Sequence, residues 1–232
     1  MQQNGIAADK VFLLDKPKTW TSFDLTRFLK KIAGVKAGHA GTLDPLATGL
    51  MIVCTGKMTK KVDYFQGLDK TYSGTICLGA TTPSFDLETE EDSHSWVAHL
   101  SLSLLEGLAG ELKGTYEQTA PVFSAKKIDG KRAYHLARAG KEVKIKSHLV
   151  KVEEFSLSNL RFEGEKAYVD FFVACSKGTY IRSLARDLGI KSGAGGYLTE
   201  LRRLSIGPYQ VERSFNIEEL RALFPKNPAE RS

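Results

Sequence analysis

The stretch from Gly38 to Gly49, GHAGTLDPLATG, constrains the fold of this chain more than any other. It carries glycines at 38, 41 and 49 and one carboxylate, Asp44, which directly precedes Pro45. Glycine permits tight turns and close backbone approaches, and proline restricts the freedom that remains. Because the apolar run LMIVC follows, we expect a loop that enters a buried strand and holds a single acid in a defined place.

Apolar runs and helical spacing predict the elements around this loop. Thr21 and Asp24 form a capping box, and Gly34 suits the end of the helix that follows. The patterns predict strands over 11–17, 50–54, 70–79 and 166–176, helices over 22–33, 58–67, 97–110, 178–189, 197–204 and 216–224, and an exposed acidic loop over 84–93. Strands and helices alternate irregularly, so we expect an α+β fold with a mixed or antiparallel sheet.

Charge is concentrated in one segment. The net charge is +6, and residues 124–151 alone carry nine Lys and Arg against Asp129 and Glu142, or +7, which leaves −1 for the rest. Clustered cations favour a polyanion because binding releases counterions from a phosphate backbone. A solvated lysine-rich face remains the alternative for a charge run taken alone. We expect one domain over 1–232, with 124–151 as a basic insertion that holds a short helix near 132–140.

Several classes of protein lack support in the sequence. No apolar run approaches the roughly 18 residues of a membrane span, and the first residues do not resemble a secretory signal, so we expect a soluble cytoplasmic protein. Cys54, Cys77 and Cys175 lie far apart in apolar surroundings and are expected to be buried thiols. The five histidines lack metal-ligand spacing, and no phosphate-binding glycine motif is present, so we expect no metal and no nucleotide cofactor.

Taken singly, the candidate residues have ordinary structural explanations. Asp44 before Pro45 could cap a turn, Tyr72 could be a core aromatic residue, and Arg182 could form a surface ion pair. A hydrolase or phosphotransferase that uses Asp44 as its nucleophile would need a second acid or a metal-binding cluster nearby, and the loop has none.

In combination, six blocks resemble one family, the TruB-type tRNA pseudouridine-55 synthases. The blocks keep their order along nearly the whole chain: LLDKPKTWTSFD at 13–24, GHAGTLDPLATGLMIVCTGKMTK at 38–60, KTY at 70–72, SAKKIDGKRAYHLARAG at 124–140, CSKGTYIRSLARDLG at 175–189 and LTELRR at 198–203. The resemblance implies the catalytic fold of pseudouridine synthases. Members usually continue into a small C-terminal PUA-type RNA-binding module, which we expect this chain to lack.

The resemblance also implies a reaction and its catalytic residues. Such enzymes isomerise one uridine in the T-loop of tRNA to pseudouridine, without a redox cofactor or a metal. By resemblance Asp44 is the nucleophile, which attacks either C6 of the base or C1′ of the ribose. Tyr72 stacks on the target base, and Arg182 is the cationic partner of Asp44.

Further residues are implied to bind the RNA. The target uridine must be flipped out of the loop, and His39 would enter the stack in its place. The other residues carried over for substrate binding are Tyr180 and Leu201 in the pocket and Lys126, Lys131 and Arg132 in the basic insertion, which would clamp the T-arm stem-loop. No obligatory protein partner is expected. A non-catalytic tRNA-binding or tRNA-folding protein on the same scaffold is the alternative.

Overall fold

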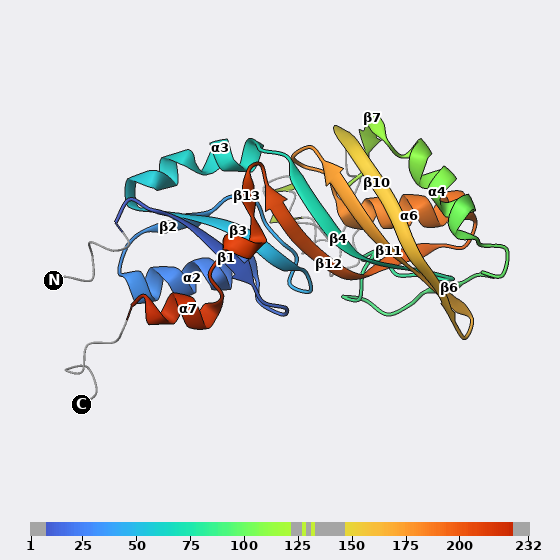
Figure 1. The fold of residues 1–232 in the computed structure, drawn as a ribbon, viewed down its shortest axis with the longest axis horizontal. Helices are drawn as coiled ribbons and strands as arrows, with labels where there is room; N and C mark the ends of the chain where they lie inside the picture. Colours follow the sequence, from blue (N-terminus) through green and yellow to red (C-terminus); the bar gives the residue numbers. More distant parts are fainter. Residues whose placement is uncertain (1–7, 122–126, 129–130, 133–146, 225–232) are drawn as a thin grey trace. The chain divides into compact units, whose positions relative to one another are not determined.

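The computed structural model describes residues 8–121, 127–128, 131–132 and 147–224 (Figure 1). The chain divides into two compact units, of which unit 1 comprises Met1–Thr71 with Arg202–Ser232 and unit 2 comprises Tyr72–Leu201. The boundaries fall within strands β4 (Lys70–Leu78) and β12 (Gly196–Ile206). One catalytic domain over the whole chain stays a prediction.

Unit 1 is built around strand β3 (Thr48–Thr55), which has neighbours on both sides. β1 (Val11–Lys16) pairs antiparallel with it along its length. On the other side, β2 (Ala37–His39) pairs antiparallel with one end, and the last part of β12 runs parallel to the other end. β13 (Tyr209–Gln210) pairs antiparallel with β12. The sheet is therefore mixed, as predicted.

The first helix of unit 1 has the bounds that its capping residues predict. α2 (Ser22–Ala33) has the Thr21–Asp24 capping box, and it ends at Gly34, whose φ of 67° is left-handed. The remaining helical segments are η1 (Gly56–Lys61), α3 (Val62–Gly67), η2 (Val211–Arg213) and α7 (Ile217–Ala222).

The core of unit 1 follows from the alternation of β3. Leu50, Ile52 and Cys54 face one side and pack with Phe65 of α3. On the other side, the ring of Phe12 in β1 lies 6.3 Å from that of Phe224, after α7. Figure 1 shows α3 on one side of these strands and α2 and α7 on the other. Both faces are thus covered, and β3 is buried along nearly all of its length.

Unit 2 contains a sheet of strand order β4-β11-β10-β7. Its long hairpin is formed by β10 (His148–Glu163) and β11 (Lys166–Cys175), and β7 (Gly114–Gln118) pairs antiparallel with β10. The other elements are β5 (Ala80–Thr81), β6 (Ser93–His94), β8 (Lys127–Ile128), β9 (Lys131–Arg132), α4 (Leu102–Glu111) and α6 (Ile181–Ser192).

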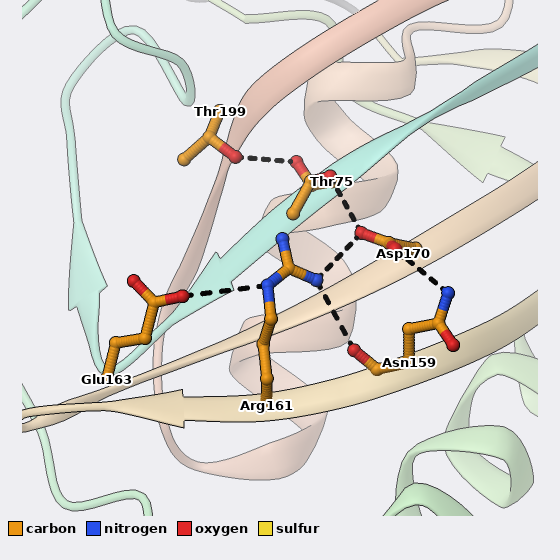
Figure 2. A network of polar contacts seen from close by, with 6 residues as sticks. All are labelled: Thr75, Asn159, Arg161, Glu163, Asp170 and Thr199. Atoms are coloured by element: carbon orange, nitrogen blue, oxygen red, sulfur yellow. Dashed lines mark hydrogen bonds and ion pairs between the residues drawn. The ribbon is translucent and has the colours of Figure 1, made fainter.

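A polar network joins four strands of unit 2 (Figure 2). Asp170 of β11 accepts hydrogen bonds from Thr75 at 2.8 Å, Arg161 at 3.0 Å and Asn159 at 3.2 Å, and Thr199 donates to the Thr75 carbonyl at 3.2 Å. Burial alone would raise the pKa of Asp170, but these donors lower it. Asn159 has a φ of 52° at a shift in the β10 register. The network therefore fixes an irregular strand against its neighbours.

The structure corrects two predicted helices. Residues 197–204 lie in β12, because Arg203 and its neighbours form long-range contacts that override local helical preference. The helix predicted over 97–110 begins only at Leu102, where the Ser101 hydroxyl accepts the Leu104 N–H. Val97 and Leu100 are buried as their spacing suggests, but they precede the helix.

Three further boundaries differ from prediction. The helix predicted over 178–189 is α6, which runs from Ile181 to Ser192. The acidic segment 84–93 is a loop with β6 beginning at its end, but it is not wholly exposed, since Ser84 and Asp86 are buried. The last residues of the 124–151 insertion, from His148 onward, belong to β10 and so to the sheet. The short helix predicted near 132–140 lies, apart from residue 132 in β9, outside the described residues. The three cysteines are buried thiols that form no disulfide, as predicted.

Candidate active site

Asp44 lies in unit 1 in the segment 38–50, here called the Asp44 loop, which runs from the end of β2 to the start of β3. The residue is half-buried. The Ala47 N–H donates to the Asp44 carbonyl at 3.1 Å, which closes a turn with Pro45 in the second position. The turn fixes the backbone on which the carboxylate stands.

Ser22 holds the residue just before Asp44. Its buried hydroxyl accepts the Leu43 N–H at 2.8 Å and lies 3.0 Å from the Leu43 carbonyl oxygen, to which it can donate. Ser22 is also the first residue of α2, so the capped start of that helix anchors the Asp44 loop. Two backbone groups of Leu43 thus have one partner, which leaves this peptide little freedom to move.

Lys16, the last residue of β1, holds the residue after Asp44. Its fully buried ammonium group donates to the carbonyl oxygens of Trp20 at 2.6 Å, Pro17 at 3.0 Å and Pro45 at 3.2 Å. Burial lowers the pKa of Lys16 to about 8, and attraction to Asp44 opposes this shift. Lys16 therefore supplies a buried positive charge that stabilises the Asp44 carboxylate.

Arg203 of β12 joins the two ends of the Asp44 loop. Its guanidinium donates to the carbonyl oxygens of Leu50 at 2.7 Å and Gly41 at 3.3 Å, and the residue is 1% exposed. At Gly49 the φ is 105°, and an added Cβ would lie 2.3 Å from the Arg203 carbonyl oxygen. Glycine is therefore required at position 49 because β12 passes too close for any side chain.

Arg182 lies in the first turn of α6, in unit 2, and it is 3% exposed. Its Nη1 donates to the Ser84 carbonyl at 3.1 Å and lies 3.5 Å from the Asp86 carboxylate. Phe85, between these two partners, has a left-handed φ of 61°. That conformation is costly for an aromatic residue and brings both neighbours to one guanidinium. We call residues 82–86 and 178–182 together the Arg182 corner.

The other predicted residues fall in both units. His39 ends β2 in unit 1 and is half-buried, whereas Tyr72, Tyr180 and Leu201 belong to unit 2. Tyr72 is 7% exposed in β4, and Tyr180 precedes α6. Lys126 lies outside the described residues. Lys131 and Arg132 lie in β9, and their side chains also fall outside what the structure describes.

Four residues of these sites escaped the sequence analysis. They are Lys16, Arg203, Asp86 and Gln118, the last of which hydrogen-bonds to the Tyr180 backbone, and all are buried. A charged residue at the end of the apolar run before Pro17 could have drawn attention to Lys16. No comparable signal distinguishes Asp86 from the other acids of 84–93.

The two units differ in charge. Unit 1 carries 17 Lys and Arg against 10 Asp and Glu, or +7, whereas unit 2 outside 124–151 carries 7 against 15, or −8. The charge of −1 outside 124–151 is therefore the sum of a positive unit 1 and a negative remainder of unit 2. By net charge alone, unit 1 favours a polyanion and unit 2 outside 124–151 disfavours one.

The described residues contain neither a candidate metal site nor a candidate membrane-spanning helix. Within that part of the chain, no group of His, Cys, Asp and Glu has the arrangement to hold a metal ion. No helix in the described ranges is long and apolar enough to cross a membrane.

Comparison with known proteins identifies the family. Residues 28–181 match the TruB family pseudouridylate synthase (N terminal domain), and residues 182–231 match the tRNA pseudouridylate synthase B C-terminal domain. The tRNA pseudouridine synthase B of Parabacteroides distasonis is 45% identical over 227 residues, which are 95% of each chain. That of Thermobifida fusca is 43% identical over 226 residues, which are 95% of this chain and 77% of the relative.

A solved structure agrees with the sequence relatives. The crystal structure of a Cbf5-Nop10-Gar1 complex contains a chain with a TM-score of 0.70 and 26% identity. The match covers 94% of this chain and 55% of that chain, so this chain spans about half the length of that structural relative. Family match, sequence identity and fold thus agree, and the chain belongs to the TruB family of pseudouridylate synthases.

Proposed function

We propose that this chain converts a uridine of tRNA, the T-loop uridine at position 55, into pseudouridine. The relatives at 43–45% identity over most of the chain are named tRNA pseudouridine synthase B, which supports the activity and the tRNA substrate. The observation that carries the proposal is the match of residues 28–181, which include the Asp44 loop, to the pseudouridylate synthase family.

Asp44 is the proposed nucleophile. The reaction breaks the C1′–N1 bond of the uridine, joins C1′ to C5, removes the C5 proton and adds a proton to N1, so reactant and product are isomers. A carboxylate that adds to C6 or to C1′ holds the intermediate while the base is repositioned. The proposal is supported by the fixed backbone around Asp44 and by the buried Lys16 charge that attracts its carboxylate.

The remaining residues take the roles that the family resemblance implies. Arg182 is the proposed cationic partner of Asp44, Tyr72 stacks on the target base, and Tyr180 and Leu201 line the pocket. His39 fills the space left by the flipped uridine. The segment 124–151, with Lys126, Lys131 and Arg132, clamps the T-arm. The charge of +7 on both unit 1 and this segment supports RNA binding.

The test uses the purified chain and a tRNA transcript, with nucleoside analysis for pseudouridine. We expect one pseudouridine per transcript and none when position 55 is changed to cytidine. Modification of both transcripts would contradict the assignment of position 55. RNA binding without any pseudouridine would instead favour the alternative, a non-catalytic tRNA-binding or tRNA-folding protein.

A further inference from the structure

Gln118, the last residue of β7, makes two hydrogen bonds to the backbone of one residue at the Arg182 corner. Its Oε1 accepts the Tyr180 N–H at 2.8 Å, and its Nε2 donates to the Tyr180 carbonyl at 3.2 Å. Gln118 is 1% exposed, so water does not compete for these bonds. One side-chain amide thus satisfies both the donor and the acceptor of Tyr180.

The start of α6 has no capping side chain of its own. α2, α4 and α7 begin after Thr21, Ser101 and Asn216, whose side chains accept N–H groups of the first turn. α6 begins after Tyr180, whose side chain makes no such bond. The start of α6 is instead held by hydrogen bonds to residues outside the helix. Gln118 binds the Tyr180 backbone, and the Ser183 hydroxyl of the first turn donates to the Thr119 carbonyl at 2.8 Å.

Tyr180 is also held from a second side. Its ring packs edge-on against His148 of β10, with ring centroids 5.9 Å apart, and His148 Nε2 lies 3.0 Å from the Gly178 carbonyl oxygen. Arg182 follows only two residues after Tyr180. A shift of the Tyr180 peptide would therefore move both the Tyr180 ring and the guanidinium of Arg182.

We propose that Gln118 is a positioning residue for the reaction, which sets the place of Tyr180 and Arg182 by holding the Tyr180 peptide. This inference rests on the proposed function, because it concerns the same site. Glutamine suits the task since it offers a donor and an acceptor side by side, matched to the carbonyl and the N–H of one residue. A flipped amide would place donor against donor and acceptor against acceptor.

The electrostatic surroundings of Gln118 keep its partners neutral. Nε2 lies 3.3 Å from the Tyr116 hydroxyl, and burial, with a smaller contribution from Asp187, raises the pKa of Tyr116 to about 12. Tyr116 therefore stays protonated at the pH of any activity assay. The ionisable side chains that act on Tyr116 or contact Tyr180 are Asp187 and Arg186 of α6, Cys175 of β11 and His148 of β10.

Two substitutions test the proposal. Gln118→Met keeps the volume and removes both hydrogen bonds. Gln118→Glu keeps the shape, but its ionised form presents an acceptor to the Tyr180 carbonyl. When protonated, a carboxylic acid again offers one donor and one acceptor, and burial raises its pKa toward neutrality. Glu117→Gln is the matched control, since Glu117 is the exposed neighbour on the same strand.

The measurements are single-turnover pseudouridine formation and RNA affinity from pH 6 to pH 8, each divided by the wild-type value at the same pH. We expect Gln118→Met to be about tenfold slower at every pH with RNA affinity within about twofold. Gln118→Glu should be as slow as Gln118→Met at pH 8 and should recover most of the wild-type rate at pH 6. Glu117→Gln should behave as wild type.

Two results would overturn the proposal: a Gln118→Met rate within twofold of wild type, or a Gln118→Glu ratio that does not change with pH. Hydrogen exchange of the Tyr180 amide gives a readout without RNA, and we expect faster exchange in Gln118→Met than in Glu117→Gln. If the wild-type chain forms no pseudouridine, the proposed function fails. Unchanged Tyr180 exchange in Gln118→Met would then overturn the positioning role separately.

Discussion

The Asp44 loop in unit 1 and the Arg182 corner in unit 2 are held by groups of opposite kind. The loop that carries the acid is held by two buried cations, Lys16 and Arg203, on its carbonyl oxygens. The corner that carries the cation is held by a carboxylate, Asp86, and by the neutral amide of Gln118. Each unit thus places a buried group of opposite charge beside the residue proposed to act in the reaction.

This difference has a consequence for pH dependence. Lys16, with a pKa of about 8, loses its proton in the range where enzymes are assayed. Arginine stays protonated far above that range, and a glutamine amide does not titrate. Alkaline pH should therefore act on the Asp44 loop and leave the Arg182 corner unchanged.

The largest effect on stability is expected in unit 2, from Asp86→Ala. The side chains of Arg182 and Asp86 are 4% and 9% exposed, so removal of the carboxylate leaves a buried charge without this partner. The free energy of unfolding should fall by about 4 kcal/mol in denaturant titration. Glu90→Ala, an exposed change in the same loop, should cost less than about 0.5 kcal/mol. Equal losses for the two variants would contradict a structural role for the pair.

The next effect is the titration of Lys16 in unit 1. Its pKa of about 8 in the folded chain lies below the ordinary 10.5, so the unfolded chain binds more protons between these values. The contribution of Lys16 to the free energy of unfolding should therefore rise between pH 8 and 10.5, by up to about 3 kcal/mol.

The same titration should lower activity, because the charge beside Asp44 disappears. The free energy of unfolding of wild type minus that of Lys16→Met, measured at each pH, gives the contribution of Lys16 to stability. Single-turnover rates give the activity. We expect stability and activity to change in opposite directions above pH 8. A rate that stays constant from pH 7 to 9.5 would show that the Lys16 charge does not support the Asp44 loop.

A smaller effect is expected from Arg203→Met, which leaves the carbonyl oxygens of Gly41 and Leu50 without their donors. The cost should be about 2 kcal/mol in the free energy of unfolding, with a slower reaction. Arg202→Met is the matched control on the adjacent residue. Arg202 pairs with Asp15 in a partly exposed position, so its loss should cost at most about 1 kcal/mol and spare the rate. A larger loss of stability and rate in Arg202→Met than in Arg203→Met would contradict the role of Arg203 in supporting the Asp44 loop.

The smallest effect is expected at a helix cap away from the Asp44 loop. Asn216 forms a capping box with Glu219 at the start of α7, in unit 1. Asn216→Ala should cost about 1 kcal/mol without a change in the rate of the reaction. A large loss of activity in this variant would mean that general stability, and not the supports named above, determines the rate.

Local features of this protein were predictable where short-range chemistry decides the structure. The capping box of Thr21 and Asp24 and the left-handed Gly34 gave the bounds of α2. The apolar runs gave β1 and β3. The prediction that Asp44 lies in a loop between rigid elements was also confirmed, because glycine and proline determine the conformation of their own backbone.

Features that depend on distant neighbours were missed. Residues 197–204 have helical spacing, yet they form a strand because β3 pairs with β12 and accepts the Arg203 side chain at Leu50. Lys16 and Asp86 look like surface charges in the sequence. Their burial becomes evident only when carbonyl oxygens from residues far along the chain, or Arg182, surround them.

The most direct test of the account is Asp44→Asn, with Asp63→Asn as the control on an exposed acid of unit 1. Single-turnover pseudouridine formation should fall by about a thousandfold or more in Asp44→Asn, since amide nitrogen and oxygen cannot replace the nucleophile. RNA affinity and the unfolding midpoint should stay close to those of Asp63→Asn. Pseudouridine formation at the wild-type rate in Asp44→Asn would contradict the account.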